Sequence, residues 1–151
     1  GLKIQPDWLY HKYLIEQNKN MKLTVPFYLN KAGAGFPSPA TDYIEEDIDL
    51  NIHLIKNVPA TFIIRVQGKS MANVGIYDGD LLVVDKSLKP KNFSTVIANV
   101  HDELVVKNFV KTKNEQFLAS GSKKIEDKII INNESDIFIW GVVTYVIHSV
   151  Y

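Results

Sequence analysis

The sequence predicts a mainly β domain with a short helix and an extended N-terminal arm. After residue 61, short runs rich in Val, Ile, Phe and Thr alternate with Gly, Asp, Asn, Lys or Pro, a pattern typical of β-strands joined by turns. Apolar residues near the N-terminus are spaced as in a helix. A Gly-Ala-Gly segment separates that stretch from the strand-rich part. We therefore expect one β-rich domain with an arm in front of it.

The first 47 residues are expected to hold two helices and one extended segment. Residues 7–17 contain two apolar pairs at i,i+4 spacing, which favours a helix. Residues 23–29 look extended, although Pro26 excludes a central strand. Ser38, as an N-cap before a proline, predicts a second helix that continues to about residue 47.

The strand-rich part predicts seven strands and one tight hairpin. The hairpin is expected at His101-Asp102, although this is a weaker turn pair than Asn-Gly. The expected strands cover residues 61–66, 81–85, 95–100, 103–109, 116–119, 128–131 and 137–147. Together they indicate a sheet large enough to enclose a hydrophobic core.

Composition limits the possible partners. Of 151 residues, 46% are hydrophobic, and 17 Lys and Arg balance 17 Asp and Glu. A zero net charge argues against direct binding of duplex DNA. The chain has no cysteine, no apolar run long enough to span a membrane, and no histidine spacing typical of a metal site. We expect a cytoplasmic protein without metal or cofactor.

One serine stands where a nucleophile could be presented. The strand over residues 61–66 is followed by Gln67-Gly68-Lys69-Ser70, and Gly68 allows a sharp change of direction. Adjacent backbone N–H groups in such a turn can face a developing oxyanion. Loops of this kind are common, however, and a serine in one is more often an ordinary polar residue.

One lysine lies inside a β-branched strand. Lys107 is expected to share a strand face with Val105 and Phe109. Burial on that face would favour a neutral amine, which can accept a proton from a serine hydroxyl. The alternative is an edge-strand lysine that extends to water, and the strand by itself favours that alternative.

A longer ordered match decides between these interpretations. The matching segments include Gly35-Phe-Pro-Ser-Pro-Ala40, Gly68-Lys-Ser-Met71, Asp78-Gly-Asp-Leu-Leu82 and Val106-Lys107. In these segments the chain resembles the LexA/UmuD family of Ser-Lys self-cleaving peptidases, over roughly residues 33–148. It differs in having Ala34 where UmuD-type proteins typically have Cys, and Lys69 where relatives have Asp or Met.

The resemblance implies a LexA-like peptidase domain over residues 35–151 and a cleavable arm over residues 1–34. It implies that Ser70 is the nucleophile and Lys107 the general base. The amides of Lys69 and Ser70 would bind the oxyanion, and Ala34–Gly35 would be the scissile bond.

The resemblance also implies a role in the SOS response to DNA damage. The protein would be a homodimer whose self-cleavage is stimulated by a RecA filament on single-stranded DNA. The trimmed product would serve a UmuC-type translesion polymerase in error-prone DNA repair synthesis. The alternatives are a LexA-type self-cleaving repressor, for which 34 residues before the cut leave no room for a DNA-binding head, and a non-catalytic dimeric binding platform. A signal peptidase also uses Ser and Lys, but no membrane segment is visible here.

Overall fold

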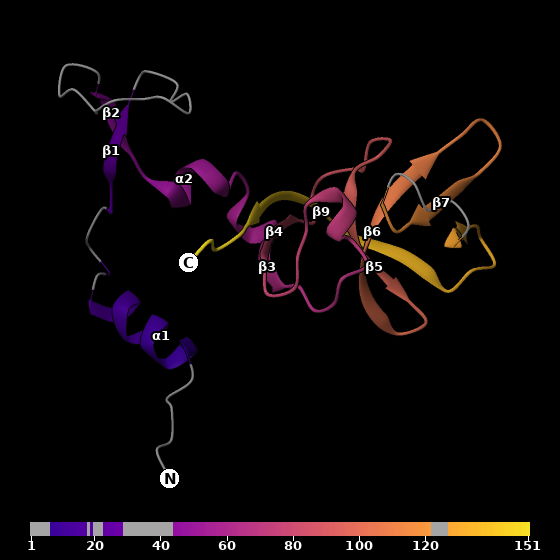
Figure 1. The fold of residues 1–151 in the computed structure, drawn as a ribbon, viewed down its shortest axis with the longest axis horizontal. Helices are drawn as coiled ribbons and strands as arrows, with labels where there is room; N and C mark the ends of the chain where they lie inside the picture. Colours follow the sequence, from indigo (N-terminus) through magenta and orange to yellow (C-terminus); the bar gives the residue numbers. More distant parts are fainter. Residues whose placement is uncertain (1–6, 18, 20–22, 29–43, 122–126) are drawn as a thin grey trace, which may run out of the picture. The chain divides into compact units, whose positions relative to one another are not determined.

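The computed structural model describes residues 7–17, 19, 23–28, 44–121 and 127–151. The chain divides into two compact units, Gly1–His53 and Leu54–Tyr151. Figure 1 shows the elements in chain order, and each unit is described by itself.

The first unit contains the helix α1 (Asp7–Gln17), as the sequence predicts. The strand β1 (Val25–Tyr28) pairs antiparallel with β2 (Ile44–Ile48). Two strands alone leave each with an unpaired edge, so the missing N–H of Pro26 is tolerated. The expected extended segment is thus confirmed over residues 25–28.

The predicted helix over residues 38–47 is wrong where the structure describes it. Residues 44–48 form β2, and residues 38–43 lie outside the described part of the chain. The helix in this region is α2 (Leu50–Leu54), which begins after Asp49. The Asp49 carboxylate accepts a hydrogen bond from the amide of Asn51 at 2.9 Å, so Asp49 caps the helix start. Cross-strand pairing with β1 therefore overrides the local helix signal that precedes this cap.

The second unit is built on a seven-stranded sheet in the order β3-β4-β9-β5-β6-β7-β8, with antiparallel neighbours throughout. The strands are β3 (Thr61–Arg65), β4 (Leu81–Asp85), β5 (Thr95–Val100), β6 (Glu103–Lys111), β7 (Gln116–Ala119), β8 (Ile129–Ile131) and β9 (Ile137–Ile147). Two short 3₁₀ helices, η2 (Val58–Ala60) and η3 (Ala72–Val74), flank β3. The mainly β fold and the seven predicted strands are confirmed, with strand ends that differ by two residues at most.

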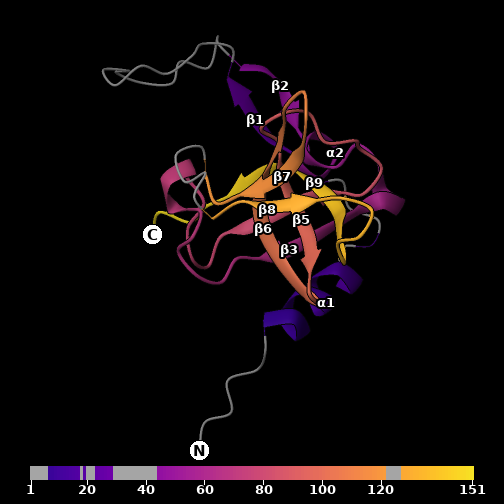
Figure 2. The same cartoon turned by 90° about the vertical axis from the view of Figure 1, so that its right-hand side faces the viewer.

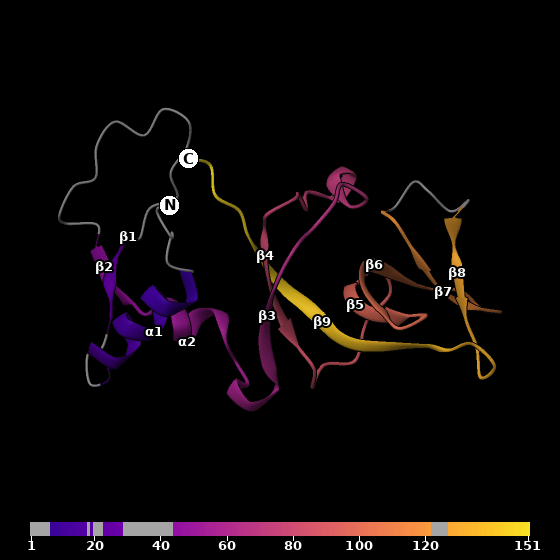
Figure 3. The ribbon, with the colours of Figure 1, turned by 90° about the horizontal axis from the view of Figure 1, so that it is seen from below.

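The long strand β9 joins the two halves of the sheet. Its C-terminal half pairs with β4 and its N-terminal half with β5, and Figure 3 shows it running from one group of strands to the other. The ladder with β5 has a register shift next to Gly141, and the ladder with β4 has one at Thr144. A Cβ on Gly141 would lie 2.6 Å from Cγ1 of Val84, so only glycine fits this close approach.

The core of this unit has two hydrophobic clusters. The first consists of Val66, Met71, Ile76, Leu82, Val84 and Ile97. The second consists of Val96, Ala98, Phe109, Leu118 and Val142. Because Val96 and Ile97 are neighbours on β5 and point to opposite faces, β5 separates the two clusters. Figure 2 shows β5 next to β6 and β9, its partners in the sheet.

The hairpin predicted between β5 and β6 is present. Val100 pairs with Glu103, and the two residues between them, His101 and Asp102, have φ angles of 50° and 66°. Two consecutive left-handed residues form a type I′ turn, whose twist matches that of the strands.

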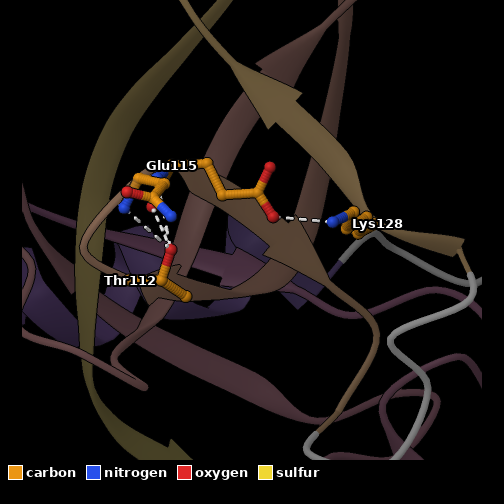
Figure 4. Close-up of polar contacts among 4 residues, drawn as sticks. Thr112, Glu115 and Lys128 are labelled. Atoms are coloured by element: carbon orange, nitrogen blue, oxygen red, sulfur yellow. Dashed lines mark hydrogen bonds and ion pairs between the residues drawn. The ribbon is translucent and has the colours of Figure 1, made fainter.

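At the other end of β6 a polar cluster closes the β6–β7 turn (Figure 4). The amide of Thr112 donates to the carbonyl oxygen of Glu115 at 2.9 Å, and the amide of Glu115 donates back to the Thr112 hydroxyl at 3.2 Å. The Glu115 carboxylate also pairs with Lys128 at 2.6 Å. Since both charged side chains are partly exposed, this pair contributes on the order of 1 kcal/mol or less.

Candidate active site

Ser70 lies in the loop that follows β3. Gly68 has a φ of +102°, a value that favours glycine, and the chain turns there after leaving the sheet. The amide of Ala72 then donates to the carbonyl oxygen of Lys69 at 3.2 Å, which closes a turn around Ser70. Ser70 itself is exposed, so a peptide can approach its hydroxyl.

Fixed contacts hold this loop on both sides of Ser70. The amide of Gly68 donates to the Asp78 carboxylate at 2.7 Å, and the amide of Gly79 donates to the carbonyl oxygen of Val66 at 2.9 Å. On the other side, Met71 is only 2% exposed and belongs to the first hydrophobic cluster. A backbone anchored at Gly68 and Met71 leaves little freedom to Ser70 between them.

The amides of Lys69 and Ser70 lie in the same loop. Neither donates a hydrogen bond to another residue within the part of the chain that the structure describes. They are therefore available as donors to a substrate oxygen, the property that the predicted oxyanion role requires.

Lys107 lies in the middle of β6, opposite Val96 of β5. Strand alternation places it on the same face as Val105 and Phe109, and both of these pack in the second hydrophobic cluster. This face of β6 therefore packs against the core, and β6 is an inner strand, which the sequence of the strand by itself did not favour. Lys107 is half-buried, so its amine lies between the core and solvent.

Ser70 and Lys107 line the same cleft, which has a volume of about 330 Å³. Its walls come from the end of β3, the Ser70 loop, β5 and β6. The lining residues are Ile64, Arg65, Val66, Gln67, Gly68, Ser70, Met71, Ile97, Leu104, Val105, Val106 and Lys107. The lining offers apolar and polar surface in similar amounts, so the cleft can both pack against a peptide and form hydrogen bonds with it. Ala34 and Gly35 lie outside the described residues.

The sequence did not indicate that a second serine lies next to Lys107. The amine of Lys107 donates to Oγ of Ser120 at 2.6 Å. Ser120 follows β7 and is 8% exposed. Asn108 pairs with Ala119 in the β6–β7 ladder, so the next residues along the two strands are Lys107 and Ser120. The contact follows from the register of β6 against β7. That register is set by the assembled sheet, so no local pattern in the sequence predicts it.

A buried carboxylate stabilises the base of the Ser70 loop. Asp80 is 3% exposed, accepts the amide of Tyr77 at 2.9 Å, and lies 2.6 Å from Nδ1 of His148. Because a carboxylate can only accept, His148 is the donor. The Tyr77 amide and then His148 hold the pKa of Asp80 below its ordinary value. The end of β9 is thus tied to the segment that anchors the loop.

The described residues contain no group of three His, Cys, Asp or Glu side chains placed to hold a metal ion. They also contain no helix long and apolar enough to cross a membrane.

The sequence profile of the Peptidase S24-like family matches residues 26–144. The chain belongs to this family. The match begins within β1, covers the Ser70 loop and Lys107, and ends within β9. The S24 family is a family of serine peptidases, and the resemblance to the LexA/UmuD group is confirmed.

Named relatives of this S24 chain agree with that assignment. The protein ImpA of Salmonella typhimurium is 42% identical over 123 residues, which cover 82% of this chain and 83% of ImpA. The protein MucA of the same species is 38% identical over 122 residues, or 81% and 83% of the two chains. The LexA repressor of Shewanella denitrificans is 36% identical over 105 residues, which cover 70% of this chain but 50% of the repressor.

Proposed function

We propose that this S24 chain is an SOS-response serine endopeptidase that cleaves its own Ala34–Gly35 bond. One observation carries the proposal: Ser70 and Lys107, distant in sequence, line one cleft. The serine is exposed on an anchored loop, and the lysine lies on an inner strand beside apolar residues. A nucleophile and a base of this kind suit acyl transfer.

The proposed reaction has two stages. The neutral amine of Lys107 takes the proton of the Ser70 hydroxyl while Oγ attacks the carbonyl carbon of Ala34. The amides of Lys69 and Ser70 stabilise the oxyanion. The C–N bond then breaks, and the Gly35 nitrogen leaves with the proton held by Lys107. In the second stage Lys107 deprotonates a water, which attacks the acyl carbon. The ester bond to Oγ of Ser70 then breaks, and Oγ takes the proton back from Lys107. Because the substrate is part of the same chain, its high effective concentration favours a single turnover.

The biological part of the proposal follows from the family. We propose that residues 1–34 are the cleavable arm and residues 35–151 the peptidase domain, which acts as a homodimer. A RecA filament on single-stranded DNA would stimulate cleavage, and the trimmed product would be an accessory subunit of a UmuC-type translesion polymerase. The zero net charge supports contact with DNA through these proteins rather than directly.

Two substitutions test the dyad. Purified protein incubated at alkaline pH should convert to a smaller species on a denaturing gel. Ser70→Ala removes the attacking oxygen and should abolish conversion. Lys107→Arg should also be inactive, since the guanidinium stays protonated and cannot act as a base. Conversion by either variant at the wild-type rate would remove that residue from the mechanism.

A LexA-type repressor is the second candidate, because a LexA repressor is among the relatives. The two candidates differ in whether the protein binds duplex DNA by itself. An electrophoretic mobility shift at moderate salt should show no tight duplex binding by this chain. A stable, salt-sensitive complex would favour the repressor.

A further inference from the structure

We propose that Ser120 is a positioning residue for the general base of the self-cleavage reaction, through its hydrogen bond to Lys107. The inference rests on the proposed function and adds a residue that neither the sequence motifs nor the mechanism above includes. Its main support is the 2.6 Å contact between Nζ of Lys107 and Oγ of Ser120.

A lysine base needs such a partner because its side chain is long and its amine rotates. Holding the long side chain of a lysine in one geometry costs rotamer entropy, and a fixed hydrogen bond offsets that cost. A hydroxyl oxygen that accepts one N–H fixes the rotation of the amine, so the lone pair is left for the Ser70 proton. After proton transfer Lys107 is an ammonium, and the same hydrogen bond becomes charge-assisted and stronger. Ser120 therefore stabilises the charge that appears during attack.

Ser120 is well placed for this task. It is 8% exposed, so water competes little for its hydroxyl, and it follows directly after β7. The β6–β7 ladder brings the backbones of the two residues side by side, which makes the contact a consequence of strand register rather than of side-chain freedom.

A second observation connects Ser120 to the nucleophile loop. The neighbouring Gly121 has a φ of +82°, and a Cβ there would lie 2.7 Å from Cγ of Asn73. Asn73 belongs to η3, the 3₁₀ helix that starts two residues after Ser70. The side chain of Asn73 thus packs against the backbone next to Ser120. Ser120 therefore holds Lys107 close to the segment that follows the nucleophile.

The test compares self-cleavage rates at alkaline pH for the full chain and its variants. Ser120→Ala should cleave about 10- to 100-fold more slowly, the usual effect of a misplaced catalytic group. Ser120→Thr keeps a hydroxyl and should restore most of the rate. Ser120→Val has nearly the shape of Thr without the hydroxyl and should stay slow. Should the Ala variant fail to fold, the Thr and Val pair decides the matter.

A matched control removes a hydroxyl elsewhere. Ser87 donates to the Asp85 carboxylate, also at 2.6 Å, and does not line the cleft. Ser87→Ala should cleave at the wild-type rate, which shows that loss of a short serine hydrogen bond is not itself sufficient.

Rates measured across a range of pH show whether Ser120 acts on the position of the Lys107 amine or only on its protonation. If it acts on position, Ser120→Ala should still cleave more slowly than wild type at alkaline pH values where a further increase in pH no longer raises the rate. A deficit that disappears there, or equal rates for the Thr and Val variants, would overturn the inference while leaving the dyad intact. Failure of the wild type to cleave at all would overturn the proposed function together with this inference.

Discussion

Asp78 offers a sharp test of how the nucleophile loop is held. Its carboxylate accepts the amide of Gly68 at 2.7 Å, two residues before Ser70. A hydrogen bond to a charged acceptor is worth about 1.5–3 kcal/mol when shielded. Here both residues are exposed, so we take about 1 kcal/mol. If this hydrogen bond stabilises the transition state and not the resting protein, its loss raises the barrier by that amount. Asp78→Ala should then slow self-cleavage about 5-fold.

The assay for Asp78 is the first-order rate of self-cleavage at one alkaline pH, together with the free energy of unfolding in urea. Asp78→Asn retains a side-chain oxygen acceptor and should lose less than the Ala variant. Asp136→Ala makes the same change of charge at an exposed residue outside the cleft, and it should leave the rate unchanged. If Asp78→Ala cleaves at the rate of Asp136→Ala, the anchored-loop reasoning is refuted.

Three other predictions concern the core, acid stability and regulation. Gly141→Ala should lower the free energy of unfolding in urea by about 1–3 kcal/mol, because the new methyl group meets the side chain of Val84. Combining it with Val84→Ala should recover part of that loss, and a double variant whose loss equals the sum of the two single losses would contradict this explanation. The pKa of the Asp80 carboxyl is lower in the folded than in the unfolded protein, so its stabilisation is complete above the ordinary value of 3.8 and is lost as pH falls below it. The free energies of unfolding of wild type and Asp80→Asn should therefore converge as the pH falls below 3.8. A difference that stays constant with pH would show that the Asp80 carboxylate does not stabilise the folded protein in this way. Addition of RecA filament on single-stranded DNA should accelerate cleavage near neutral pH, and an unchanged rate would remove the regulatory part of the proposal.

The strands could be predicted because each is a β-branched run with turn residues at both ends. Leu81–Asp85 and Thr95–Val100 match their predicted bounds for that reason. The helix predicted from Ser38 failed over residues 44–47 because β1 supplies a pairing partner and Asp49 supplies the true cap. A propensity argument sees neither tertiary pairing nor which of two possible caps is used.

The site could be predicted only in part. Ser70 and Lys107 were found through family motifs, and the structure places both on one cleft. The contact of Lys107 with Ser120 depends on the β6–β7 register, and the contact of Asp80 with His148 joins residues 68 apart in the chain. Such contacts follow from the assembled sheet and have no local signature in the sequence.

The position of the cut tests the central claim most directly. Purified protein, incubated alone at alkaline pH and analysed by intact-mass spectrometry, should give two products that correspond to residues 1–34 and 35–151. Gly35→Glu should block the cut, because a bulky charged side chain at the scissile bond obstructs attack while Ser70 and Lys107 stay intact. Ser70→Ala should give only the uncut mass. A cut at another bond, or persistent cutting by repurified Ser70→Ala, would contradict self-cleavage by the Ser70–Lys107 dyad.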